Sequence, residues 1–258
     1  MVVAERIDRV LKRIETIIRE SYRDGSRIGY FAALYYRVTT TIKGRLGTGF
    51  FYDDDRLQRL DEAFAGRYFS ALEAWRSGSP ELLGSWRVAF EATRDSNLST
   101  LQHLLAGVNP HMNVDLGAAC VDIASGEAID TLKCDFNHIN ELLTTIVPVV
   151  REELEEESWI IKTASTLFSF LEDEALDEGI FLARGSSWRF ALKLAQEDEE
   201  ARASSIKARD EVVEGIGHKL VDPSLLSRVL NTLSRDDDGA DVRRIIRLLT
   251  PDELELEA

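Results

Sequence analysis

Apolar residues recur along most of this chain at intervals of three and four, the spacing that places side chains on one face of an α-helix. The first stripe of this kind consists of Ile7, Val10, Leu11, Ile14, Ile17 and Ile18. It predicts a helix that ends near Gly25. Only 5 of the 258 residues are proline and 16 are glycine, whereas a β domain of this length needs many more turn residues. The sequence therefore predicts an all-α fold, a single-domain multi-helix bundle.

Similar stripes predict helices over the rest of the chain. The approximate segments are 28–38, 53–75, 80–90, 98–107, 111–124, 130–147, 151–175, 188–194, 197–216, 223–233 and 242–249. Pro80 and Pro110 are expected in the first turns of helices, and Pro148 at a kink or boundary. The stretch 184–187 is expected to be a turn between helices. We expect residues 1–225 to form the helical domain and residues 226–258 a short helical extension with a polar linker over 234–241.

Charge and composition narrow the classes of partner. The formal net charge of −15 repels phosphate backbones and anionic lipid surfaces, so we expect neither nucleic-acid nor membrane binding. No apolar run approaches the ~18 residues that span a bilayer, and a cytoplasmic, acidic protein is expected. The two cysteines, Cys120 and Cys134, lack metal-binding spacing and are predicted to be reduced core thiols. The oligomeric state is open.

The middle of the chain holds a dense group of polar residues. Its members are His103, Asn109, His111, Asn113, Asp115, Asp122, Asp135, Asn137, His138 and Asn140. His111 and Asp115 are four residues apart and Asp135 and His138 three apart, so each pair shares a helix face. Segment 111–124 is otherwise small or apolar and should be buried. Buried imidazoles and carboxylates need partners, which predicts a buried polar pocket between segments 111–124 and 130–147.

Three kinds of partner fit this pattern. In the first, a divalent zinc, iron or manganese ion is the cofactor. Its candidate ligands are His103, His111, Asp115, Asp135 and His138. In the second, Asp115 or Asp135 orients a neutral His111, which exchanges a proton with a bound organic molecule. In the third, the cluster joins helices through hydrogen bonds and carries out no chemistry. In each case Asn109, Asn113 and Asn140 are expected to line the pocket.

The segment from Gly107 to Leu116, read together with Asp135-Phe136 and Asn140, resembles an uncharacterised helical domain family of bacteria and fungi. The stretch 67–72 and Trp188 extend the resemblance over residues 10–225 or so. It implies a helical fold and no established activity. The family pattern of His, Asn, Asp and Asp-Phe matches His111, Asn113, Asp115 and Asp135. The resemblance thus supports a functional polar pocket more than it supports a metal site.

Together these observations predict an enzyme that acts on a small-molecule substrate at a buried His/Asp site between two helices, with or without a metal ion. The expected catalytic residues are His111, Asp115 and Asp135. One alternative is a cofactor-free isomerase or cyclase of specialised metabolism, in which an apolar pocket shapes the substrate and His and Asp act as base and acid. Another is a non-catalytic ligand-binding or interaction module whose polar cluster is structural.

Overall fold

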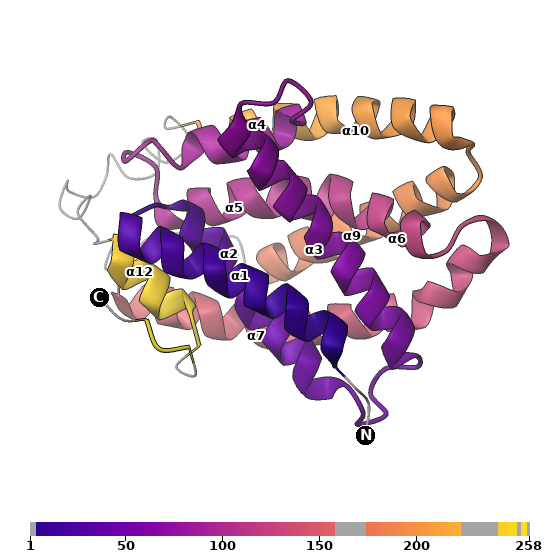
Figure 1. The fold of residues 1–258 in the computed structure, drawn as a ribbon, viewed down its shortest axis with the longest axis horizontal. Helices are drawn as coiled ribbons and strands as arrows, with labels where there is room; N and C mark the ends of the chain where they lie inside the picture. The colour runs from indigo at the N-terminus through magenta and orange to yellow at the C-terminus, as the bar shows by residue number, and fades with distance from the viewer. Residues whose placement is uncertain (1–3, 158–173, 223–241, 252–253, 257–258) are drawn as a thin grey trace.

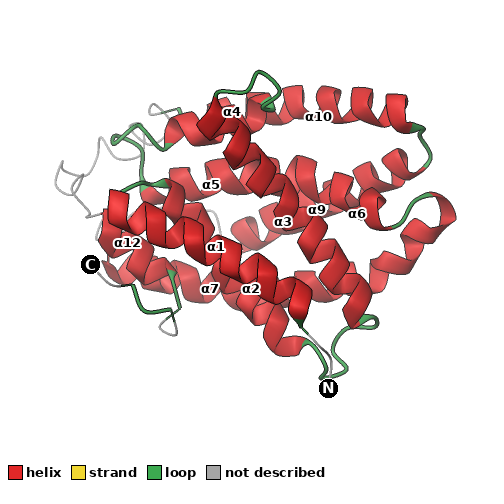
Figure 2. Cartoon of the chain, in the orientation of Figure 1, coloured by secondary structure: helices red, strands yellow, loops and turns green. Residues whose placement is uncertain are grey.

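The computed structural model describes residues 4–157, 174–222, 242–251 and 254–256. The predicted helix at 223–233, the linker at 234–241 and most of the predicted helix at 151–175 lie outside these ranges. Within them every regular element is a helix and no strand occurs (Figure 2). This confirms the all-α prediction. No described helix is long and apolar enough to cross a membrane.

The first three helices form one side of the bundle, with α1 packed on both α2 and α3 (Figure 1). They are α1 (Glu5–Asp24), α2 (Ile28–Arg45) and α3 (Asp54–Ser77). The predicted apolar stripe of α1 is buried throughout, and the helix ends at Gly25 in the left-handed conformation. The side chain of Asp53 accepts a hydrogen bond from the amide of Arg56, so an aspartate caps α3 as expected.

The other described helices complete the bundle. They are α4 (Gly84–Ala92), α5 (Thr100–Pro110), α6 (Leu116–Ile123), α7 (Lys133–Glu157), α9 (Glu174–Ala195), α10 (Glu199–Leu220) and α12 (Val242–Leu249). A five-residue π-helix, η1 (His111–Asp115), joins α5 to α6, and a 3-10 helix, η2 (Gly126–Leu132), precedes α7. Figure 1 shows α10 along one edge of the molecule, above α5 and beside α4. Helix α6 packs mainly against α9 and α3.

Two helix starts predicted at prolines are wrong, and a third proline, predicted to kink or end a helix, does not end it. Helix α4 begins at Gly84 rather than at Pro80, because its first amides bind the side chain of Asp210. Pro110 lies inside α5, and Pro148 lies inside α7, which continues to Glu157. A proline in a helix interior costs about 3 kcal/mol, and packing of the residues around it can outweigh that cost.

Two further predictions from local sequence are wrong. The stretch 184–187, predicted to be a turn, lies within α9, where Arg184 and Ser187 are buried. Cys134 is exposed, although Cys120 is buried as expected, and both thiols are free. For residues 184–187, the burial of Arg184 and Ser187, and not the local residue types, decided the conformation.

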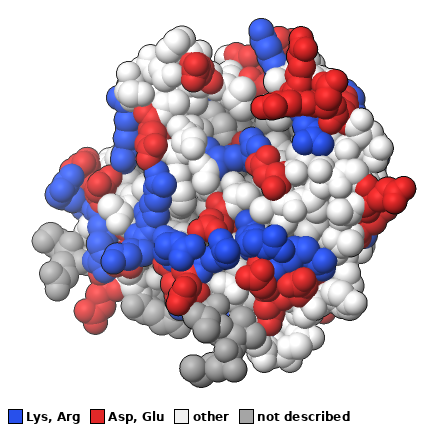
Figure 3. Space-filling model, turned by 45° about the vertical axis from the view of Figure 1, so that its right-hand side comes forward, with Lys and Arg blue, Asp and Glu red and all other residues white. Residues whose placement is uncertain are grey.

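Although the chain is acidic overall, basic side chains also gather on part of its surface. Figure 3 shows a band of Lys and Arg side chains across one face, with acidic side chains beside it. Between α1 and α3, Arg6 and Arg9 both bind Glu62, and Arg76 binds Glu20. Exposed pairs of this kind each stabilise a fold by about 0–1 kcal/mol, so the band does not explain the fold.

Close packing of α6 on α9 depends on Gly117. A Cβ atom at Gly117 would lie 2.7 Å from the Phe190 ring and 3.1 Å from the backbone oxygen of Ser187. We predict that Gly117→Ala lowers the free energy of unfolding by about 1–3 kcal/mol, because the backbone cannot move aside as a flexible side chain can. Urea denaturation measures the effect.

Gly66→Ala in α3 is the matched control, since a Cβ there meets no atom within 4 Å. It should raise the free energy of unfolding by about 0.5–1 kcal/mol, the usual gain for alanine over glycine in a helix. Equal effects of the two substitutions would contradict the packing of α6 on α9.

Candidate functional site

The candidate site is built on η1, the π-helix that carries His111 and Asp115. Its widened turn leaves two carbonyl groups that side chains of other helices bind. Ser187 of α9 donates its hydroxyl to the oxygen of Met112, and Arg209 of α10 donates Nε to the oxygen of Asn113 at 2.9 Å. Single π-turns inside helices are rare and frequent at functional sites. Here the turn places His111 and Asp115 toward α2, α3 and α4.

His111 and Asp115 are in direct contact, as their spacing predicted. His111 Nδ1 lies 3.3 Å from Asp115 Oδ2, and Trp86 of α4 donates its indole N–H to the same oxygen at 3.0 Å. The side chains of His111 and Asp115 are only 4% and 3% exposed, so water does not screen the interaction. Asp115 thus fixes the orientation of the imidazole and leaves Nε2 pointing away from it.

Aromatic rings surround the imidazole of His111. Phe64 stacks on it with ring centroids 3.6 Å apart and an angle of 9° between the planes. Tyr35 stands edge-on with its centroid at 4.7 Å, and Phe31 does so at 5.4 Å. Trp86 and Tyr68 lie slightly farther away. Phe64 differs from Phe31, Tyr35, Trp86 and Tyr68 in being only partly buried, so its outer side reaches solvent.

Several buried polar atoms in this aromatic setting have no hydrogen-bond partner among the described residues. They are His111 Nε2, the hydroxyls of Tyr35 and Tyr68, and Asp61 Oδ2. Asp61 and Tyr68 lie seven residues apart on one face of α3, the face that also presents Phe64. Buried polar atoms are nearly always hydrogen-bonded, and those that are not call for a ligand, water or a reaction as explanation.

The protonation equilibria of two of these groups are shifted in opposite directions. Burial raises the pKa of the Asp61 carboxyl from 3.8 to about 7, with a smaller contribution from the negative charge of Glu62. Burial lowers the pKa of His111, although the Asp115 carboxylate opposes the change. The hydroxyls of Tyr35 and Tyr68 have raised pKa values, again because of burial. Near neutral pH the site therefore combines a neutral imidazole with a carboxyl group that can still hold its proton.

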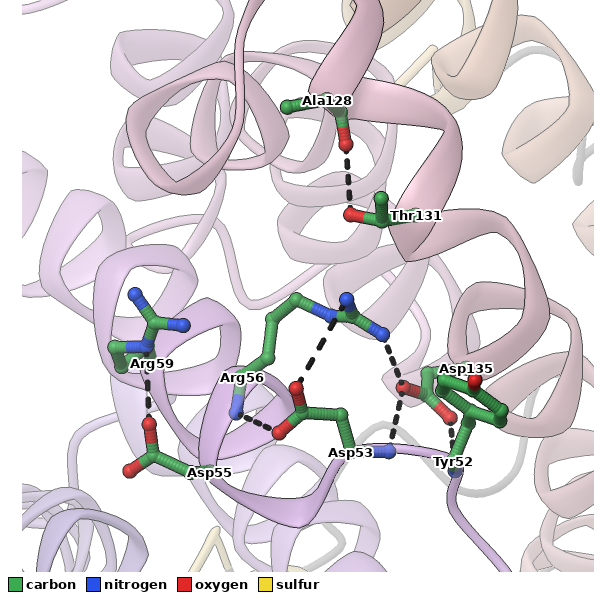
Figure 4. Close-up of polar contacts among 8 residues, drawn as sticks. All are labelled: Tyr52, Asp53, Asp55, Arg56, Arg59, Ala128, Thr131 and Asp135. Carbon is green, nitrogen blue, oxygen red and sulfur yellow. Dashed lines mark hydrogen bonds and ion pairs between the residues drawn. The ribbon is translucent and has the colours of Figure 1, made fainter.

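Asp135 is in a different place from the His111–Asp115 pair. Its carboxylate faces the start of α3, where it accepts backbone hydrogen bonds from Tyr52 at 2.6 Å and Asp53 at 3.2 Å (Figure 4). Arg56 Nη2 lies 3.4 Å from the same group. His138 Nδ1 is 3.8 Å from Asp135, and its ring contacts Phe50. These contacts tie the start of α7 to the loop before α3.

The other predicted site residues are dispersed. His103 lies two helical turns before His111, roughly 12 Å along the axis, and packs edge-on against Tyr30. Asn113 donates to Asn109, which in turn donates to the backbone oxygen of Val213 in α10 at 2.9 Å. Asn140 accepts a hydrogen bond from the buried Arg184 of α9.

The expected metal ligands do not converge. In the described part of the chain no group of three or more His, Cys, Asp or Glu side chains has the arrangement of a metal site. His111 and Asp115 form one pair and Asp135 and His138 another, while His103 contacts Tyr30. The expectation that the two pairs meet between segments 111–124 and 130–147 is not met, because η1 and α6 pack mainly on α3 and α9.

Sequence reasoning missed two residues of interest, Asp61 and Arg184. Asp61 lies within the apolar stripe of α3, four residues after Leu57 and three before Phe64. A carboxylate at a position of such a stripe predicts a buried acid. The sequence did not indicate that Arg184 is buried in a helix, because the Gly-Ser-Ser that follows it resembles a turn.

The shifted pKa of Asp61 predicts an unusual pH dependence of stability. Between about pH 4 and 7 the folded protein holds a proton on Asp61 that the unfolded chain releases, so stability falls as the pH rises through this range. Asp61→Asn removes this titration. We predict that the variant matches the parent near pH 4 and exceeds its free energy of unfolding at pH 8 by as much as about 4 kcal/mol. Urea denaturation at several pH values measures the difference.

Asp122→Asn, which changes a more exposed carboxylate paired with Arg67, is the control and should show no such rise. A constant difference between Asp61→Asn and the parent from pH 4 to 8 would contradict the buried, protonated Asp61.

Comparison with known proteins places the site within a family. The model of a family of unknown function, DUF5995, matches residues 7–223. Neither the curated proteins nor the solved structures gave a match. The matched region includes every residue of the His111 site and ends before α12. The resemblance seen in the sequence is thereby confirmed, and the chain belongs to this family of unknown function.

Proposed function

We propose that this protein is an enzyme that uses His111 as an acid–base catalyst on a small organic molecule. The observation that carries the proposal is the pairing of His111 Nδ1 with Asp115, while Nε2 is buried and has no partner among the residues described. An unpaired buried nitrogen costs about 1–3 kcal/mol. A purely structural histidine would be expected to satisfy both nitrogens, whereas a general base needs one of them free.

The surrounding residues have roles in this proposal that follow from their chemistry. Asp115 holds the tautomer with hydrogen on Nδ1 and stabilises the imidazolium when Nε2 takes a proton, and Trp86 fixes Asp115. Asp61, whose carboxyl retains a proton close to neutral pH, supplies a proton to the substrate directly or through Tyr35. Burial magnifies these effects, since water neither competes nor screens.

The aromatic surroundings define the class of substrate. Rings of Phe31, Tyr35, Phe64 and Tyr68 favour a flat, apolar molecule, and the unpaired hydroxyls favour one or two oxygen atoms on it. Acid–base chemistry without a cofactor on such a molecule corresponds to isomerisation or cyclisation. The metal-assisted version raised by the sequence has less support, because the candidate ligands lie apart.

Access requires movement of Phe64. This ring covers the imidazole on one side and is itself only partly buried, whereas the other rings around His111 are buried. Movement of one side chain on α3 is sufficient in principle, since side-chain rotation occurs without unfolding.

A second candidate function is favoured by the near-complete burial of His111, which is 3% exposed. In that case Trp86, Asp115 and His111 hold α4 to η1, and the protein is a non-catalytic ligand-binding or interaction module. The two candidates differ in what happens when His111 is removed.

We predict that His111→Ala abolishes catalysis while the variant stays folded. Small aromatic alcohols, ketones and acids would first be screened for stabilisation of the parent against heat, and the compounds that stabilise it followed for conversion by NMR. The variant should lower the rate at least ~100-fold, the usual contribution of a general base. Its free energy of unfolding should fall by about 1–3 kcal/mol, because Asp115 loses a hydrogen-bond partner whether or not the histidine is catalytic. Asp115→Asn should lower the rate but bind the compound.

The non-catalytic candidate predicts the same loss of stability but no conversion of any compound. The enzymatic proposal is overturned if the parent converts none of the compounds that stabilise it, or if folded His111→Ala converts a compound as fast as the parent does.

A separate prediction tests Phe64 as the cover of the site. In Phe64→Ala, diethyl pyrocarbonate should modify His111 at least ~10-fold faster than in the parent, because the reagent attacks an exposed neutral imidazole. Mass spectrometry of the peptide that contains His111 measures the rate, and the exposed His218 provides an internal reference. An unchanged rate at His111 would show that Phe64 does not control access.

A further inference from the structure

A buried cation lies outside the His111 site, on the face of α9 that contacts α7. Arg184 is only 2% exposed, and its guanidinium carbon lies 4.3 Å from the centre of the Phe136 ring. Its Nε donates to Asn140 Oδ1, and its Nη2 donates to the backbone oxygen of Phe136 at 3.1 Å. Both acceptors are neutral. A guanidinium has five N–H groups, so most of its donor capacity is unused in these contacts.

No carboxylate within the described ranges pairs with Arg184. Arg6, Arg13 and Arg67, by contrast, each bind a Glu or Asp. Cys120 is near enough to interact electrostatically, but burial raises the pKa of its thiol to about 12, so it carries no charge at neutral pH. Burial also lowers the pKa of Arg184 to about 10, and the group is still a cation at neutral pH.

A second cation, Lys133, also lies near the Phe136 ring. Lys133, at the start of α7, places Nζ 4.6 Å from the centre of the Trp188 ring and 5.5 Å from that of Phe136. It has no acidic partner in the described residues either. The pKa of Lys133 is lowered, first by partial burial and then by the positive charge of Arg184, so the two cations repel each other. Lys133 is exposed and gives the pair a side open to solvent.

A buried guanidinium beside a second cation, with no anion, is costly. The cation–π contact of Arg184 with Phe136 offsets about 0.5–2 of the several kcal/mol that burial of a guanidinium takes. Buried charges in proteins are therefore usually paired with an opposite charge or bind a ligand. An anion with one negative charge and two or three acceptor oxygens would complete the site, because its oxygens can accept two parallel hydrogen bonds from a guanidinium group.

We propose that Arg184 and Lys133 form a binding site for an oxyanion, the carboxylate or phosphate group of a small molecule, at the junction of α7 and α9. Asn140 orients the guanidinium, and Lys133 contacts the anion from the solvent side. The site shares no residue with His111 and Asp115, so it does not depend on their proposed function.

The test uses the full-length protein, with sodium phosphate and sodium acetate as separate probes at constant ionic strength set by sodium chloride. At ten times Kd the bound anion should raise the melting temperature by about 3–6 °C. Lys133→Gln should weaken binding about tenfold, the usual effect of losing one charge-assisted contact. A larger response to phosphate or to acetate identifies which oxyanion the site prefers.

Lys12→Gln is the matched control, because it removes the same charge from an exposed position on α1. It should bind the anion as the parent does. Lys133 is exposed, so its variant should fold, and Arg184→Gln need be used only as a second variant that loses binding. The proposal is overturned if neither anion stabilises the parent beyond chloride, or if Lys133→Gln and Lys12→Gln bind equally well.

Discussion

One turn of α10 determines the geometry of the candidate site. Arg209 binds the free carbonyl of Asn113 in η1, and Asp210 binds the amides of Gly84 and Ser85 at the start of α4. The backbone oxygen of Val213 accepts the side chain of Asn109. These contacts fix α4 relative to η1, and with it the indole of Trp86 relative to Asp115. The His111 site therefore depends on a helix that contributes no residue to it.

The polar interior of this protein is of two kinds. Asp135 and Asp210 bind backbone amides at the starts of α3 and α4, which have no partner within the helix, and Asn109 binds the backbone oxygen of Val213 within α10. His111 and Asp61 instead have acceptor atoms without a partner among the described residues, and Arg184 donates only to the neutral groups of Asn140 and Phe136 in that part of the chain. Satisfied groups of the first kind stabilise the fold. Groups of the second kind lower stability, and proteins retain such groups mainly where a ligand or a reaction uses them.

Helix α9 contacts the elements of the two proposed sites through different residues. Ser187 of α9 binds the oxygen of Met112 in η1, one helical turn away from Arg184, which binds Asn140 and Phe136 in α7. Helix α9 thus contacts both η1, which carries His111, and the residues of the proposed anion site. These contacts explain the Asp-Phe and Asn residues of the sequence pattern. Asp135 binds the loop before α3, and Phe136 and Asn140 contact Arg184.

The sequence alone determined those features that depend on contacts within one helix. The apolar stripe of α1, the capping of α3 by Asp53 and the contact of His111 with Asp115 all follow from spacings of three or four residues. Only the tertiary structure decided which helices meet, and therefore that Asp135 faces the start of α3 and that Phe64 stacks on His111. It also decided that helices continue through Pro110, Pro148 and residues 184–187. The reason is energetic: a local preference of about 1–3 kcal/mol is smaller than the packing of several side chains, and packing depends on residues distant in sequence.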